Sequence, residues 1–199
     1  MIGRASLVLA VLLAAPALPA QDASSLAGGT RRQVAGAEQV DQRLAARFPA
    51  SVAVRFAGVI DSAGRERLPT EPLILRALEG GAKGVPADRI QTALTRLAAS
   101  LRRAMATLGP ETPETDLTTA ATALQTGLEP SRLLELRNLR GEKSLTVPVG
   151  AYLDLVAQGA VAERAWLRVM DLARRQAVDR DYERIDPADL VARRPEDRR

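Results

Sequence analysis

Four arginines in the middle of the chain are the residues best spaced to bind a ligand. Arg89, Arg96 and Arg103 recur every seven residues, and Arg102 adjoins the last of them. Seven residues are close to two turns of α-helix, so the three recurring arginines would share one helix face. Guanidinium groups pair with carboxylates and phosphates, and such a face predicts attraction to anionic surfaces. The solvated side of an amphipathic helix shows the same pattern and is the competing interpretation.

Trp166 is the second binding candidate, as an aromatic anchor for a partner's groove. Val169 and Leu172 follow it at helical spacing, so packing in the core is the alternative. No aromatic residues interleave with the arginines to stack bases, and a net charge of +4 does not demand nucleic acid. We therefore expect no nucleic-acid partner.

Two further groups of residues could support hydrolysis. Glu111, Glu114 and Asp116 cluster at a predicted helix start, and glycosidases use a pair of carboxylates. Lys143 and Ser144 are adjacent in a polar loop, where a desolvated lysine could activate the serine. However, the helix dipole favours acids in the first turn of any helix, and an exposed loop does not desolvate a lysine. A helix cap and a solvated turn are the simpler interpretations.

Other chemistries are excluded by residue types that the chain lacks. The sequence contains no histidine and no cysteine, so histidine-based triads, thiolate sites, the usual zinc sites and disulfides cannot be built. The segment 80–84 has glycines and Lys83 like a phosphate loop, but its spacing is wrong and it predicts a helix end. We expect no cofactor and no metal ion, and we assign no catalytic residue.

Helices must carry these candidates, because apolar residues recur at intervals of three and four. Prolines follow apolar residues where a helix would begin. The predicted helices cover residues 51–67, 71–82, 86–108, a segment from 113, 130–140, 149–158 and 162–178. The alternation of Val52, Val54 and Phe56 leaves a strand over 51–60 as an alternative.

The predicted fold is all-α. We expect a single domain over residues 37–178, with about seven short-to-medium helices in an irregular orthogonal bundle or a short curved helical array. Three helix starts near Gly84, Gly127 and Gly159 resemble one another, but their spacing is uneven and indicates no named repeat family.

The two ends differ from this domain. Residues 1–20 have the basic start, apolar run and small-residue end of a signal peptide, with cleavage expected after Ala20 or alternatively Ala17. The apolar run is shorter than the about 20 residues that span a bilayer, and a retained amino-terminal helix is the alternative to cleavage. Residues 21–36 predict a flexible lead-in, and 179–199 a charged, largely disordered tail.

These features together favour a binding protein. We expect export to the periplasm or cell exterior of a bacterium, no transmembrane segment after signal removal, and a binding or scaffold role. The expected partner is another envelope protein or an anionic envelope polymer. Two alternatives stay open, a binder of anionic surfaces through the arginines and a hydrolase-type enzyme using carboxylate or serine–lysine chemistry.

Overall fold

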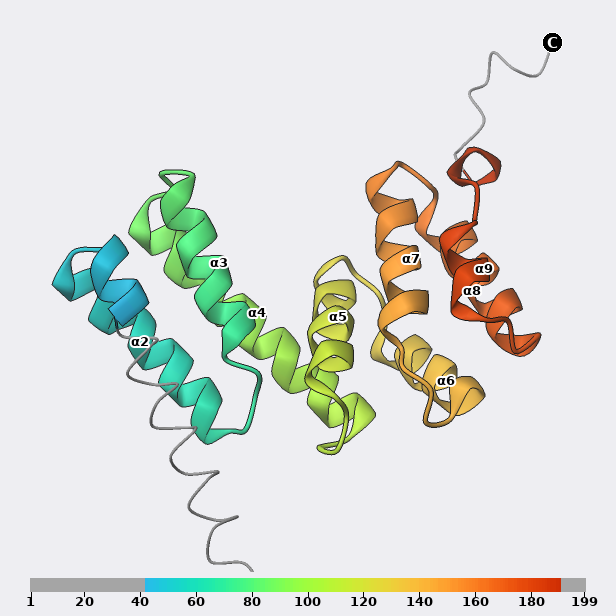
Figure 1. Cartoon of the computed structure of the whole chain (residues 1–199), viewed down its shortest axis with the longest axis horizontal. Helices are drawn as coiled ribbons and strands as arrows, with labels where there is room; N and C mark the ends of the chain where they lie inside the picture. Colours follow the sequence, from blue (N-terminus) through green and yellow to red (C-terminus); the bar gives the residue numbers. More distant parts are fainter. Residues whose placement is uncertain (1–41, 191–199) are drawn as a thin grey trace, which may run out of the picture. The chain divides into compact units, whose positions relative to one another are not determined.

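The computed structural model describes residues 42–190, and every regular element in that range is a helix (Figure 1). Residues 42–47 are helical and precede α2 (Ala50–Arg65), α3 (Glu71–Ala82), α4 (Ala87–Leu108), α5 (Glu114–Gln125), α6 (Pro130–Arg140), α7 (Thr146–Ala157), α8 (Ala162–Arg174), α9 (Asp179–Glu183) and the 3-10 turn η1 (Pro187–Asp189). The predicted all-α domain is confirmed for this part of the chain. The predicted signal peptide and lead-in lie outside the described residues.

The strand considered over 51–60 does not form. Within α2 the buried residues are Ala53, Phe56, Ile60 and Ala63, which lie three or four positions apart. This spacing gives a helix one continuous apolar face, whereas a strand would bury alternate residues.

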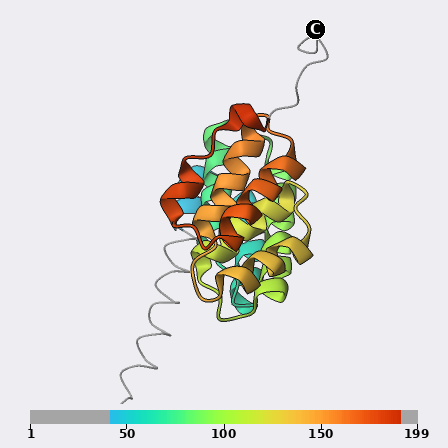
Figure 2. The same cartoon turned by 90° about the vertical axis from the view of Figure 1, so that its right-hand side faces the viewer.

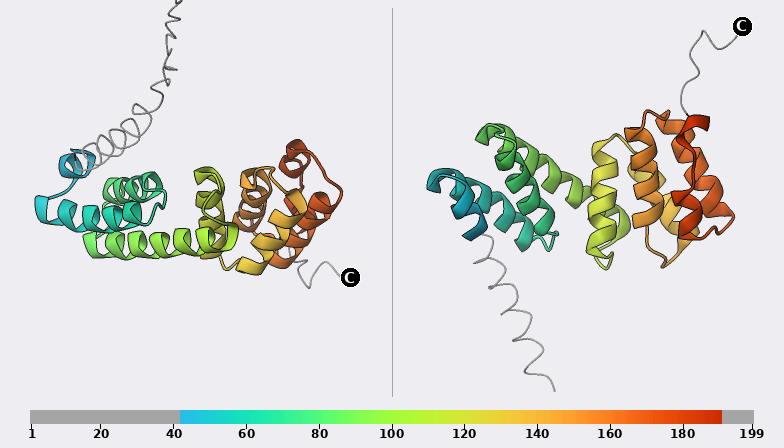
Figure 3. Two further views of the ribbon diagram at one scale, coloured as in Figure 1. Left: turned by 90° about the horizontal axis from the view of Figure 1, so that it is seen from below. Right: turned by 45° about the horizontal axis from the view of Figure 1, so that its top comes forward.

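The helices pack in two layers (Figure 3). Helices α4, α6 and α8 follow one another in one layer, and α5, α7 and α9 do so in the other. Both α2 and α3 pack on the amino-terminal part of α4. Figure 2 shows this succession from its α8 and α9 end. The sequence left open an irregular orthogonal bundle and a short helical array. The contacts between successive helices correspond to the array.

Helix α4 is the element on which α2, α3, α5 and α6 all pack. Its buried apolar residues recur along its whole length, and they are Ile90, Leu94, Leu97, Ala98, Leu101 and Ala104. The three heptad-spaced arginines of α4 stay exposed. The helix therefore presents cationic side chains beside the elements that pack on it. Within residues 42–190, none of the helices combines the length and apolar character needed to span a bilayer.

Position 80, inside α3, requires glycine because this helix passes close to α4 there. A Cβ atom on Gly80 would stand 2.8 Å from Cγ1 of Ile90, a side chain that is buried. We expect Gly80→Ala to lower the free energy of unfolding by about 1–2 kcal/mol, since overpacking outweighs the gain in helix propensity. Urea denaturation measures this change.

Gly58 of α2 is the matched control, because a Cβ atom there would meet nothing within 4 Å. Gly58→Ala should raise the free energy of unfolding by about 0.5–1 kcal/mol through helix propensity alone. If both alanine variants were stabilised, the close approach of α3 to α4 would be disproved.

The helical packing continues past Val178, where the sequence analysis placed the end of the domain. Helix α8 ends at Arg174 and Gln176 takes a φ of 56°, which turns the chain. Helix α9 follows and packs on α7 and α8. The turn η1 comes next, and the Asp186 carboxylate before it accepts a hydrogen bond of 2.9 Å from the Ala188 N–H.

Candidate functional site

A groove of about 760 Å³ lies among α3, α4 and α5. Helix α4 supplies most of the lining, α3 supplies Arg76, and α5 supplies Leu124 and Gln125. Both α3 and α5 pack on α4, as Figure 1 shows. The volume is within the range of about 300–1,000 Å³ that is typical of ligand sites.

Four arginines line this groove, namely Arg76 from α3 and Arg89, Arg96 and Arg103 from α4. Among the described residues, none of those that line it is acidic. We call it the arginine groove. The four like charges create a positive potential in a recess, where low-dielectric walls concentrate the field.

The partners of these arginines are few within residues 42–190. Arg103 donates a hydrogen bond of 3.3 Å to the Ser100 hydroxyl, and Arg76 lies 3.7 Å from Glu79 one turn along α3. Glu79 also accepts a closer contact of 2.6 Å from Lys83. No described carboxylate lies within 4.0 Å of the guanidinium nitrogens of Arg89, Arg96 or Arg103, so these three charges are the least neutralised.

The structure separates the arginines that the sequence analysis grouped. Arg89, Arg96 and Arg103 share the groove, whereas Arg102 points to the α2 side of α4. There Arg102 donates to both carboxylate oxygens of Glu66, at 2.5 and 2.8 Å. It lines a smaller hollow of about 360 Å³.

Arg76 is the groove residue that sequence reasoning missed. It lies on α3, outside the heptad pattern of α4, and only the packing of α3 against α4 brings it to the groove. No local sequence pattern indicates that Arg76 lines the groove, because its position depends on how two separate helices pack against each other.

Trp166 belongs to the core. Its side chain is 3% exposed, and its ring meets Tyr152 edge-on with the centroids 5.6 Å apart. An indole held in this way does not reach a partner's groove. Trp166 is therefore not part of the candidate site.

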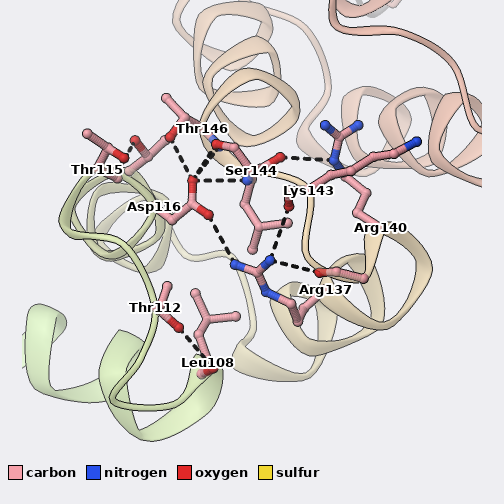
Figure 4. A network of polar contacts seen from close by, with 12 residues as sticks. Leu108, Thr112, Thr115, Asp116, Arg137, Arg140, Lys143, Ser144 and Thr146 are labelled. Carbon is pink, nitrogen blue, oxygen red and sulfur yellow. Dashed lines mark hydrogen bonds and ion pairs between the residues drawn. The ribbon is translucent and has the colours of Figure 1, made fainter.

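A second polar cluster surrounds Asp116, a buried residue in the first turn of α5 (Figure 4). Its Oδ1 accepts hydrogen bonds from the Ser144 hydroxyl at 2.6 Å, the Leu145 N–H at 2.9 Å, and the Thr146 N–H and hydroxyl at 3.0 and 2.7 Å. Its Oδ2 accepts from Arg137 at 3.0 Å. Asp116 thereby caps the amino terminus of α7 from another helix.

These contacts keep the Asp116 carboxylate charged. Burial alone would raise its pKa, but the hydrogen bonds from Ser144, Leu145, Thr146 and Arg137 together lower the pKa below its ordinary value. A carboxylate with a lowered pKa is a weak base, and every donor around it serves to hold the loop before α7. The cluster has the chemistry of a structural cap.

The structure does not bring the other hydrolytic candidates together in a closed site. Glu111 and Glu114 are exposed, whereas Asp116 is buried. Lys143 is exposed, and the Ser144 hydroxyl donates to Asp116. Within residues 42–190, no group of acidic side chains is arranged to hold a metal ion.

Arg140 extends the cluster to α9. This arginine is 9% exposed and donates to the Ser144 carbonyl at 3.0 Å and to the Asp179 carboxylate at 2.8 Å. It also donates to the Tyr182 hydroxyl at 3.3 Å, and its guanidinium lies over the Tyr182 ring, 5.4 Å from the centroid. One buried side chain thus joins α6, the following loop and α9.

Two polar features therefore stand out, a buried cluster whose donors and acceptors satisfy one another and an exposed groove whose cations are largely unpaired. Only the groove has binding capacity left for a ligand. No protein-family model, no curated protein and no solved structure matches this chain, so its function is inferred from the geometry of the arginine groove.

Proposed function

We propose that the protein is an exported binding module whose arginine groove takes an anionic ligand. The observation that carries this proposal is the convergence of four arginines from two helices on one hollow of about 760 Å³, with no acidic residue among its described lining. Repulsion among like charges disfavours such an arrangement in the free protein. A bound anion would relieve it.

The remaining lining suits a ligand that lies on α4 between the arginines. Ala93 and Ala99 also line the groove, and their side chains are much shorter than those of the arginines. A guanidinium carries five N–H donors in a planar fork, which matches the two oxygens of a carboxylate or phosphate. Thr92 donates to the Asp88 carbonyl at 2.9 Å, so its hydroxyl proton is already engaged within α4.

The groove binds rather than reacts, because its described lining holds no group that could accept a proton in catalysis. Arginine stays protonated at any physiological pH, and a general base requires a carboxylate, an imidazole or a similar group. This favours the binding hypothesis over the hydrolase alternative.

Heparin, a polyanion, provides the test. We expect the protein to be retained on heparin resin at low salt and released as salt rises, because screening shortens the reach of charge interactions from about 10 Å at 0.1 M to 3 Å at 1 M. The double variant Arg96→Gln/Arg103→Gln should weaken heparin binding roughly 25-fold, at about 1 kcal/mol for each lost pair.

Arg55→Gln/Arg102→Gln is the matched control. It removes the same charge from the α2 side of α4, where Arg55 pairs with Asp88 and Arg102 with Glu66. The control should bind heparin within about twofold of the parent protein. Equal losses in both double variants would mean that net charge, and not the groove, binds heparin.

Export rests on residues 1–20 alone. If the signal peptide is cleaved after Ala20, the mature chain begins at Gln21, and cleavage after Ala17 would begin it at Leu18. Intact-mass analysis of the protein from the periplasmic and extracellular fractions of the native bacterium distinguishes these products. Recovery of only the full chain from Met1 in the cytoplasm would refute export.

A further inference from the structure

The spacing of the arginines restricts the shape of the anion. At 1.5 Å rise per residue, Arg89, Arg96 and Arg103 are about 10.5 Å apart in turn, and the first and last are separated by about 21 Å along α4. A single phosphate or sulfate does not extend over that distance. One ligand engages all three arginines only if it is elongated and runs along α4.

The charge density of the groove restricts the ligand further. With Arg76, four cations line the groove, and the three on α4 lie about 10.5 Å apart in turn. Duplex DNA carries one charge per about 1.7 Å of its axis, which is far denser. An extended peptide advances about 3.3 Å per residue, so acidic residues at alternate positions lie about 6.6 Å apart on one side. Four such acidic residues span about 20 Å, which is close to the about 21 Å between Arg89 and Arg103 along α4.

The uncharged lining also suits a peptide. Ala93, Ala99 and Leu124 are apolar, and the Gln125 amide can both donate and accept hydrogen bonds, as a peptide backbone does. A ligand with acidic and small apolar residues in alternation would use both kinds of surface. Among the described lining residues none is aromatic, so bases would find no stacking platform.

The ends of this chain do not have the required composition. Residues 1–41 contain three arginines and three acidic residues, and residues 191–199 contain four arginines and two acidic residues. Neither end is acidic overall, so charge complementarity favours a ligand from another molecule.

Building on the proposed function, we infer that the arginine groove binds an acidic peptide segment of a partner protein. The segment lies extended along α4, its carboxylates pair with Arg76, Arg89, Arg96 and Arg103, and its small apolar residues cover Ala93 and Ala99. This assigns the groove a protein partner, in the class expected for an exported scaffold.

The test uses a fluorescein-labelled peptide of twelve residues in which glutamate and alanine alternate, and it follows the anisotropy at low salt. We expect saturable binding to the mature protein, weakened about fivefold by Arg96→Gln and less than twofold by Arg102→Gln, the paired arginine on the other side of α4. A peptide with the same six glutamates in one contiguous block should bind more weakly. Circular dichroism confirms that each variant is folded.

The outcomes separate this inference from the proposed function. Equal binding of the alternating and block peptides would overturn the inference, because charge alone would then suffice. Binding of heparin or inorganic polyphosphate that depends on Arg96, without binding of either peptide, would overturn the inference and leave an anion-binding groove. If none of these probes bound, both the inference and the proposed function would fail.

Discussion

Asp116→Ala is expected to lower the free energy of unfolding by about 3–5 kcal/mol, the range found when one partner of a buried ion pair is removed. The carboxylate is 1% exposed and pairs with Arg137, whose side chain is 19% exposed. Its loss would also leave the Leu145 N–H and the Thr146 N–H without the acceptor that caps α7. Urea denaturation followed by circular dichroism measures the change.

Glu114, two residues earlier in the same turn of α5, is the matched control because its side chain is exposed. Glu114→Ala removes an acid from the same helix end and should change the free energy of unfolding by less than about 0.5–1 kcal/mol. A loss below 1 kcal/mol for Asp116→Ala would mean that the loop before α7 is held by other contacts.

The Asp116 carboxylate makes the free energy of unfolding depend on pH, and its stabilising contribution is lost in acid. The pKa of Asp116 in the folded protein lies below the ordinary value of 3.8, so its contribution is fully present above pH 3.8 and is lost as pH falls through the folded-state pKa. The difference in stability between the parent protein and Asp116→Asn should therefore stay constant near neutral pH. It should shrink in acid below pH 3.8.

Where the signals are local, the sequence predicted the helices well. The predicted ranges 71–82 and 130–140 coincide with α3 and α6, whose first turns hold Pro72 and Pro130. The end of α3 depends on Gly84, which takes a φ of 66° just past the helix. Gly80 and Gly81, which could also have ended it, lie within the helix, where a Cβ atom on either residue would stand 2.8 Å from Ile90 or 2.6 Å from Phe48.

Where a boundary depends on a distant side chain, the prediction failed. Helix α7 begins at Thr146, three residues before the predicted start at Val149, because Asp116 supplies the acceptor for its first N–H groups. Asp116 and Thr146 are 30 positions apart. No local pattern of residues records such a cap.

The candidate site was likewise predicted in part, where it depends on one helix, and missed where it depends on the packing of several. The heptad spacing on α4 placed Arg89, Arg96 and Arg103 on one face, because that is a property of a single helix. It did not show that α3 and α5 turn this face into a groove, or that Arg76 completes it. A groove is a property of several helices, and its walls are set by tertiary packing.

The carboxy-terminal boundary shows how a charged segment can still be anchored. Residues 179–199 are mostly polar, which predicts disorder by composition. One aromatic residue, Tyr182, is 1% exposed, and its hydroxyl and ring both meet Arg140. Farther on, the Leu190 carbonyl accepts a hydrogen bond of 3.1 Å from the Val161 N–H at the start of α8. Composition averaged over the segment hides these few specific contacts.

Tyr182→Ala tests whether this anchor belongs to the folded domain. We expect it to lower the free energy of unfolding by about 3–5 kcal/mol, because it opens a cavity and leaves Arg140 without its hydroxyl and ring partner. Tyr182→Phe keeps the ring and should cost only about 1 kcal/mol, the value of the hydroxyl contact at 3.3 Å.

Val178→Ala is the matched control, since Val178 is 66% exposed just before α9, and it should change the free energy of unfolding by less than about 0.5 kcal/mol. Chemical denaturation of the three variants in parallel gives the comparison. If Tyr182→Ala were as stable as Val178→Ala, the cooperative domain would end near residue 178, as the composition of the segment suggests. A large difference between them would place α9 within the core that also holds Arg140.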